Sequence, residues 1–242
     1  MKKIIAAALL LGCGSAWAAA ISGQGTWETT LQARDLDGDR TTAEAYYDTV
    51  LDIIWLADAG YAQTSGYDAD NRMTWDEAQS WIETLNSSSY LGVNDWRLPQ
   101  VWDSGSDGCN FSYDGTDCGW NADTSTGEMA SLFYDTLGNL AALDTEGNFR
   151  GEGYNHENSG PFSNIPFFYT WADTESVVNS GEAWYFHLGL GTQNDADKTL
   201  ERATWAVRSG DIGASIVPIP AAVWLFGSAL AGLGWLRKRQ AS

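Results

Sequence analysis

Apolar residues recur with helical spacing in two segments of the chain. Residues 74–86 (TWDEAQSWIETLN) place four apolar side chains at positions i, i+3, i+4 and i+7, and Thr74 with Glu77 forms the polar signature of a helix start. Residues 127–140 (GEMASLFYDTLGNL) likewise gather Met, Leu and Phe on one face. These spacings predict two main helices.

Other segments are rich in β-branched and aromatic residues, which favour strands. They are residues 46–56, 167–171, 183–188 and 203–207. Because most strands follow the helices rather than alternate with them, we expect an α+β fold with antiparallel strands and not a parallel doubly wound sheet. The many Gly, Asn, Asp and Ser residues predict one loop-rich domain.

The C-terminal segment has a different composition. Residues 219–236 carry no charge, and a helix of that length spans about 27 Å, close to the hydrocarbon thickness of a bilayer. Arg237, Lys238 and Arg239 follow directly, which favours a cytoplasmic tail. We therefore expect one transmembrane helix at 219–236; a buried C-terminal helix is the alternative.

The N-terminus has the features of a secretory leader. Lys2 and Lys3 precede the apolar run 4–11, and Ala16-Trp17-Ala18 is a small-x-small cleavage site. Residues 1–18 are thus interpreted as a signal peptide, with a lipoprotein site at Cys13 as the alternative. Together the two ends predict an exported protein anchored in the membrane by its C-terminal helix. Its body then lies outside, at the cell surface or in the extracellular matrix.

Charge is distributed unevenly. All 32 acidic residues lie between residues 19 and 216, but only eight of the 13 basic residues do, so that segment has a formal charge of −24. Such a surface repels nucleic acid and anionic membranes. Nucleic acid is therefore not expected as a partner.

The cysteine count fits an oxidising compartment. Once the leader is removed, only Cys109 and Cys118 remain, in the stretch CNFSYDGTDC. Asp114-Gly115 can turn the chain back between them. We predict a disulfide that closes this short loop.

The C-terminal 26 residues, 217–242, resemble a PEP-CTERM-type sorting signal of the Val-Pro-Leu-Pro-Ala variety. Paired prolines precede the apolar span and its basic tail, and the motif position is filled by Val217, Pro218, Ile219, Pro220 and Ala221. The resemblance implies recognition by a membrane-embedded exosortase-type transpeptidase. It also implies a host that makes exopolysaccharide.

The body resembles the Lcl C-terminal domain family over residues 45–210. The resemblance is carried by the Trp-containing helix, by Asp95-Trp96-Arg97-Leu98-Pro99, by residues 169–175 and 183–186, and by a strand ending at Arg208. Ala172 follows the tryptophan of YTWADTE where the family usually has serine. The resemblance implies a single C-type-lectin-like domain, here residues 19–213, and glycan-binding adhesins among the relatives.

The central motif has a structural interpretation. Pro99 favours extended geometry at Leu98, so Trp96 and Leu98 can point together into a core. Arg97 then faces the other side and can bind a carboxylate or backbone carbonyls. We expect a structural corner of the fold, with ligand binding by Arg97 as the alternative.

Acidic residues supply candidate calcium ligands. Asp35, Asp37 and Asp39 alternate around a Gly turn, but a strict EF-hand loop is excluded because position twelve is Tyr46. Calcium is the only candidate cofactor, and a solvated acidic loop is the alternative. Two further acidic clusters, 68–71 and 194–197, have the composition of turns.

Catalytic motifs are scarce. The chain has two histidines, His156 and His187, and lacks nucleophile-elbow, Walker and dinucleotide-binding motifs. No catalytic residue is assigned. Paired carboxylates leave an extracellular polysaccharide hydrolase as an alternative.

Aromatic residues in polar loops are candidate sugar contacts. These are Trp102, Tyr113, Trp120 and Tyr154. Aromatic rings stack on sugars, so the leading hypothesis is a non-enzymatic protein that binds a glycan or exopolysaccharide. The charge favours a neutral or cationic glycan over a sulfated one. The alternative is a structural biofilm-matrix protein without a specific small ligand.

Overall fold

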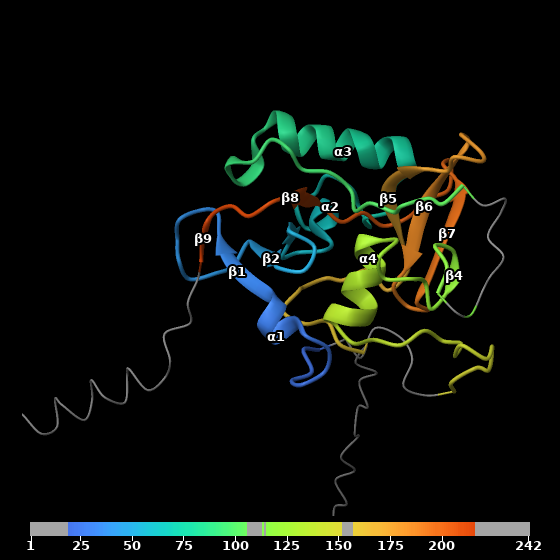
Figure 1. Ribbon diagram of the computed structural model, residues 1–242. Helices are drawn as coiled ribbons and strands as arrows, with labels where there is room; N and C mark the ends of the chain where they lie inside the picture. The colour runs from blue at the N-terminus through green and yellow to red at the C-terminus, as the bar shows by residue number, and fades with distance from the viewer. Residues whose placement is uncertain (1–18, 106–112, 114, 152–156, 216–242) are drawn as a thin grey trace, which may run out of the picture.

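The computed structural model describes residues 19–105, 113, 115–151 and 157–215 (Figure 1). Two antiparallel sheets dominate these residues. The first has the strand order β8-β3-β2-β1-β9 and the second β4-β7-β6-β5. Strands of the first sheet are β1 (Leu31–Asp35), β2 (Ala45–Asp48), β3 (Ile53–Leu56), β8 (Val207–Ser209) and β9 (Ala214–Ser215). Strands of the second sheet are β4 (Gly119–Trp120), β5 (Tyr169–Glu175), β6 (Glu182–His187) and β7 (Thr192–Asp197).

Helices are few and, with one exception, short. Among the described residues, only α3 (Trp75–Ser87) exceeds two turns. It begins at the predicted capping box: Thr74 accepts a hydrogen bond from the Glu77 amide, and Glu77 accepts one from the Thr74 amide. The start of α3 lies beside β5 (Figure 1), where the Trp75 indole donates to the Ala172 carbonyl at 2.9 Å. The short helices are α1 (Trp27–Thr30), α2 (Tyr61–Thr64), the 3₁₀ turn η1 (Tyr90–Gly92), α4 (Glu128–Ser131) and the π-helical turn η2 (Leu132–Thr136).

The predicted fold class is therefore wrong. The described domain is mostly sheet, and it is not the α+β, C-type-lectin-like domain with two main helices that the sequence suggested. The second helix stops early because α4 passes directly into η2, and Gly138 then adopts φ +66° against the backbone of Gly25. A Cβ at Gly138 would lie 2.6 Å from the Gly25 nitrogen, so the chain must turn there.

Several strands were not predicted from the sequence. Strand β7 reads TQNDAD, a composition typical of turns, yet it pairs with β6 from Thr192 to Asp197. Its neighbours supply the backbone partners that override local propensity. The predicted strands at 46–56, 167–171 and 183–188 correspond to β2, β3, β5 and β6.

One hydrophobic core joins both sheets. Four tryptophans in it are at most 1% exposed: Trp55, Trp81, Trp171 and Trp205. Phe133 of η2 packs against Phe186 of β6 with ring centroids 5.3 Å apart. Phe133 thus covers the inward face of the second sheet at Phe186.

No helix among the described residues is both long and apolar enough to cross a membrane. The expected transmembrane helix at 219–236, the sorting motif and the basic tail lie outside those residues, as does the signal peptide at 1–18. The predicted localisation, a body held outside by a C-terminal membrane anchor, is corrected accordingly. The structure supplies no such anchor in the part it describes.

Candidate functional site

The Asp-Trp-Arg-Leu-Pro motif joins the two sheets. Arg97 exchanges two backbone hydrogen bonds with Val207 at the start of β8, and the Pro99 carbonyl accepts one from Asp173 of β5. Trp96 and Leu98 are both buried, as predicted. The motif is therefore a structural corner where the first sheet meets the second.

The Arg97 side chain is fully engaged by the fold. Its Nη1 and Nη2 donate to the two carboxylate oxygens of Glu128, both at 2.7 Å, and Nη1 also donates to the Leu98 carbonyl. Glu128 in turn accepts the Gln100 amide at 2.8 Å and is only 4% exposed. This two-pronged ion pair leaves Arg97 little capacity for a ligand.

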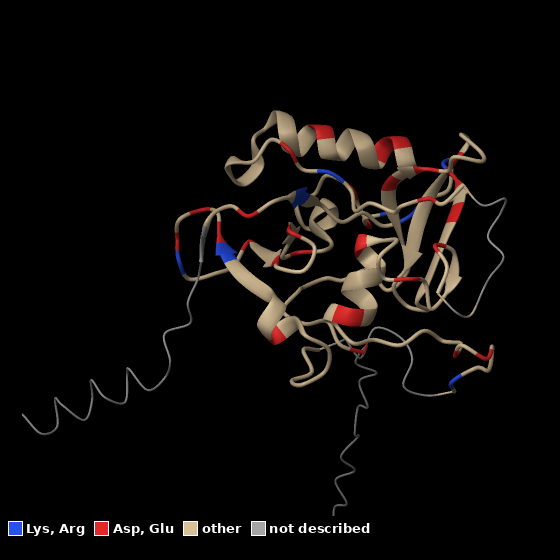
Figure 2. Ribbon diagram, in the orientation of Figure 1, with Lys and Arg blue, Asp and Glu red and all other residues tan. Residues whose placement is uncertain are grey.

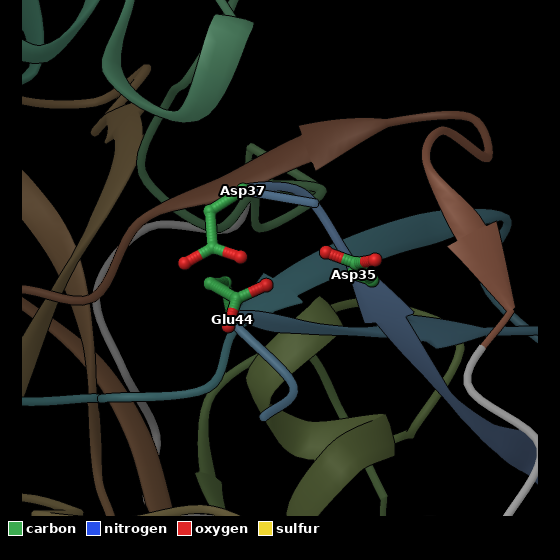
Figure 3. A group of neighbouring side chains, drawn as sticks. All are labelled: Asp35, Asp37 and Glu44. Carbon is green, nitrogen blue, oxygen red and sulfur yellow. The ribbon is translucent and has the colours of Figure 1, made fainter. Parts of the chain in front are cut away.

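Three carboxylates converge at the β1–β2 hairpin. Asp35 ends β1, Asp37 lies in the loop and Glu44 directly precedes β2. One oxygen from each lies within 4.8 Å of the others, and the three side chains face a common space (Figure 3). This arrangement offers oxygen ligands of the kind that calcium prefers.

Asp39 does not join this cluster. It accepts hydrogen bonds from the amides of Thr41 and Thr42 at 2.7 and 3.1 Å, and these bonds lower the pKa of its carboxyl group. The structure thus brings together Asp35 and Asp37 as expected, but the third member is Glu44. The β1–β2 hairpin places Glu44 beside Asp35 although the two are nine residues apart in sequence. The alternation of Asp35, Asp37 and Asp39 along the chain did not indicate this contact.

The hairpin carboxylates are also used by their own loop. Asp35 accepts the Gly38 amide at 2.6 Å, Asp37 the Asp39 amide at 2.9 Å and Glu44 the Leu36 amide at 2.9 Å. Acidic residues are spread over both sheets and many loops (Figure 2). Because acidic residues are so common in this protein, three neighbouring carboxylates are only weak evidence for a metal site.

The predicted sugar-contact aromatics are dispersed. Trp102 is 59% exposed and Tyr113 is 39% exposed, whereas Trp120 is half-buried in β4. Tyr113 and Trp120 lie near each other in the chain trace, because Asn121, the residue after Trp120, donates a hydrogen bond to the Tyr113 carbonyl. Tyr154 lies outside the described residues. Cys118 is disulfide-bonded, and its expected partner Cys109 also lies outside them.

A larger aromatic surface lies at the start of β5. Phe167, Phe168 and Tyr169 are consecutive and expose 45%, 51% and 36% of their surfaces. The Tyr169 ring contacts those of Tyr185 and His187 in the adjacent strand β6, with centroids 5.2 and 4.3 Å apart. We call these five residues the aromatic patch.

Strand register explains why Tyr169, Tyr185 and His187 of the patch face the same side of the sheet. Tyr169 pairs with His187 and Trp171 with Tyr185 in the antiparallel ladder of β5 and β6, so their side chains share a face of the sheet. Residues 202–203 run beside β5, where Ala203 bridges Thr170. Alternation along the strand then directs Arg202 to the same face as Tyr169 and Trp171.

Arg202 is surrounded by rings. Its guanidinium carbon lies 3.9 Å from the ring centroid of Tyr185, 4.4 Å from that of Tyr169 and 5.0 Å from that of Trp171. The residue is 7% exposed, and burial lowers the pKa of its guanidinium from the ordinary value. Cation–π attraction compensates part of the lost hydration.

His187 presents a nitrogen donor to the same face. Its Nδ1 accepts the amides of Gly189 and Leu190 at 3.1 and 3.2 Å, which assigns the proton of the neutral ring to Nε2. Burial lowers the pKa of His187 to about 4, and nearby Arg202 adds to the effect. The ring is therefore neutral at physiological pH.

Comparison with protein-family models, curated proteins and solved structures returned no match for this chain. The resemblance to the Lcl C-terminal domain family therefore stays a prediction from the sequence.

Sequence reasoning missed the aromatic patch, although one signal was present. Adjacent residues of a strand point to opposite faces, so the run Phe167-Phe168-Tyr169 could not be buried whole on one face. Arg202 carried no comparable signal, because its three aromatic neighbours come from β5 and β6.

Proposed function

We propose that this protein is a non-enzymatic carbohydrate-binding protein and that the aromatic patch is its sugar-contact surface. The observation that carries the proposal is the exposed run Phe167–Tyr169, which the buried rings of Tyr185 and His187 support from the adjacent strand. Exposed apolar surface costs solubility, so a contiguous patch of rings indicates a binding role.

The chemistry of the patch suits a sugar. Aromatic rings offer flat apolar faces for the C–H faces of pyranose rings, and they lose little conformational entropy on binding. The Arg72 guanidinium lies 5.1 Å from the Phe168 ring centroid, so polar donors border the rings. A sugar needs both kinds of contact because it has apolar faces and a rim of hydroxyl groups.

The same geometry gives little support to catalysis at the patch. A general base should have a pKa near the working pH, whereas the pKa of His187 is about 4 and its Nδ1 already accepts two backbone hydrogen bonds. A polysaccharide hydrolase accordingly stays the weaker alternative. The expected exosortase partner would act at residues 217–221, outside the described residues.

A binding assay with paired variants tests the proposal. Full-length protein should bind at least one oligosaccharide of a neutral and acidic panel saturably in calorimetry. Phe168→Ala should weaken that binding by about ten-fold, a typical loss for one stacking ring. Phe149→Ala is the matched control, since Phe149 is 62% exposed outside the patch.

Two outcomes would redirect the proposal. Loss of binding in Trp102→Ala with none in Phe168→Ala would move the site to the loop aromatics expected from the sequence. Absence of binding to every saccharide would overturn the proposal. A structural matrix protein acting through protein contacts would then be the better hypothesis.

A further inference from the structure

Arg202 has hydrogen-bonding capacity that the described fold does not use. Its Nε is completely buried without a hydrogen-bond partner, and no side-chain hydrogen bond from Arg202 is formed within the described residues. The two Nη nitrogens are not completely buried, so they account for part of the exposed 7%. An arginine has five N–H donors, and those at Nη are available to a ligand.

Arg202 also has no acidic partner among the described residues. Four of the eight basic residues between 19 and 215 form ion pairs: Arg34, Arg97, Lys198 and Arg208. Arg202 forms none with any described residue, although the chain has 32 acidic residues. A buried cation without a counter-ion is rare in such an acidic protein, and it creates local demand for an anion.

Within the described part of the chain, the groups next to Arg202 add donors and ring faces but no carboxylate. Tyr169, Tyr185 and Trp171 provide the rings, and the neutral His187 carries its proton on Nε2. A ligand placed here would meet nitrogen donors beside the partly exposed ring of Tyr169. A carboxylate matches these donors, because it accepts hydrogen bonds through two oxygens and pairs with the planar guanidinium.

We propose that Arg202, together with His187 and Tyr169, forms a subsite for the carboxylate of an acidic sugar of the uronic acid type. The inference rests on the proposed carbohydrate-binding function and specifies its substrate class. Tyr169 contacts the sugar ring, Arg202 pairs with the carboxylate, and His187 donates a hydrogen bond from Nε2. It departs from the expectation of a neutral or cationic glycan that followed from net charge alone.

Net charge limits which acidic glycans fit. A body of charge −24 repels a dense polyanion, but at 0.1 M salt this repulsion is screened beyond about 10 Å. The affinity for a single carboxylate then depends mainly on the nearby Arg202 guanidinium. We therefore expect a preference for isolated uronates among neutral sugars over continuous runs of charged ones.

The test compares an acidic oligosaccharide with its neutral ester. Full-length protein is titrated calorimetrically with a galacturonate oligosaccharide, with its methyl ester, which has the same rings without the charge, and with a neutral galactose oligosaccharide. We expect the acid to bind at least about ten-fold more tightly than the ester, the usual contribution of a charge-assisted pair. Arg202→Gln should weaken binding of the acid by at least about ten-fold more than binding of the ester, which removes the preference.

Two variants serve as controls. Arg40→Gln removes one exposed charge outside the patch and should keep the preference, which excludes a general charge effect. Arg202→Lys keeps the charge but loses the planar fork, so it should restore only part of the preference. Tyr169→Ala should weaken acid and ester equally, and it provides a second reading if Arg202→Gln fails to fold.

The outcomes separate this inference from the proposed function. Equal binding of acid and ester overturns the carboxylate subsite and leaves carbohydrate binding intact. Binding of no saccharide overturns both. Equal loss of acid and ester binding in folded Arg202→Gln also overturns the subsite, because Arg202 would then merely support the rings.

Discussion

Arg97 and Arg202 are chemically identical side chains in two regions of this protein, and the fold treats them differently. Arg97 at the corner between the sheets has a carboxylate on both nitrogens of its fork, plus a backbone carbonyl. Arg202 on the aromatic patch has three rings and no described hydrogen-bond acceptor.

The difference separates a structural arginine from a candidate binding arginine. At the corner, the binding capacity of the guanidinium is consumed in holding Glu128, which itself holds the Gln100 amide. At the patch, cation–π contacts stabilise the charge, and the Nη donors have no partner in the part of the chain that the structure describes. In a chain so rich in acids, the unpaired cation is the more informative feature.

The largest effect is expected at the corner. Arg97→Gln should lower the free energy of unfolding by about 3–5 kcal/mol, because it leaves Glu128 buried without its partner. Urea denaturation monitored by tryptophan fluorescence measures the loss. The double variant Arg97→Gln with Glu128→Gln should recover part of it, since no charge is then stranded.

Arg202→Gln is the matched stability control for this comparison. It should cost less than about 2 kcal/mol, because it removes cation–π contacts and strands no carboxylate. A larger cost at Arg202 than at Arg97 would reverse the assignment of structural and binding roles.

A smaller, pH-dependent effect is expected from His187. Its pKa is about 4 in the folded protein and near 6.5 when unfolded, so the unfolded state binds the extra proton first as pH falls. The contribution of the neutral ring is complete above pH 6.5 and declines towards pH 4, by roughly 3 kcal/mol in total.

Unfolding curves at several pH values measure this decline, with His187→Asn as reference. The Asn side-chain oxygen can accept the Gly189 and Leu190 amides as Nδ1 does, but it does not titrate. The stability difference between the two proteins should therefore change between pH 6.5 and 4. A constant difference over that range would show that His187 is not buried as described.

The smallest effect is expected at the acidic hairpin. Calcium at ten times its dissociation constant would raise the free energy of unfolding by about 1.4 kcal/mol, and the site should be weak because the three carboxylates already accept loop amides. Thermal unfolding with calcium or chelator measures the shift. Asp37→Asn should abolish it and Asp39→Asn should not; no shift at millimolar calcium would identify the cluster as a solvated loop.

The sequence predicted what depends on neighbours along the chain. The capping box at Thr74 and Glu77, the apolar face of α3 and the buried Trp96 and Leu98 all follow from local spacing. These features form from interactions within one helical turn or one extended segment, so a short window of sequence contains their cause.

Features that depend on pairing between distant segments could not be predicted. Strand β7 forms from turn-like residues because β6 supplies its hydrogen bonds, and Glu44 reaches Asp35 through the hairpin. Arg202 meets Tyr169 and Tyr185 only once register is set. The overestimate of helix has the same origin, since the contact of Gly138 with Gly25 interrupts the second helical segment.

The strand order of the first sheet has a consequence for how the protein folds. Its two edges are β8 and β9, the last strands among the described residues, and β9 pairs with β1 across about 180 residues. The central hairpins β1–β2–β3 are therefore complete long before either edge is covered. Closure over such a sequence separation is slow. Until residues 207–215 emerge during synthesis, the edges of β1 and β3 are open and can pair with other chains. The short segment 207–215 therefore protects the nascent protein from aggregation.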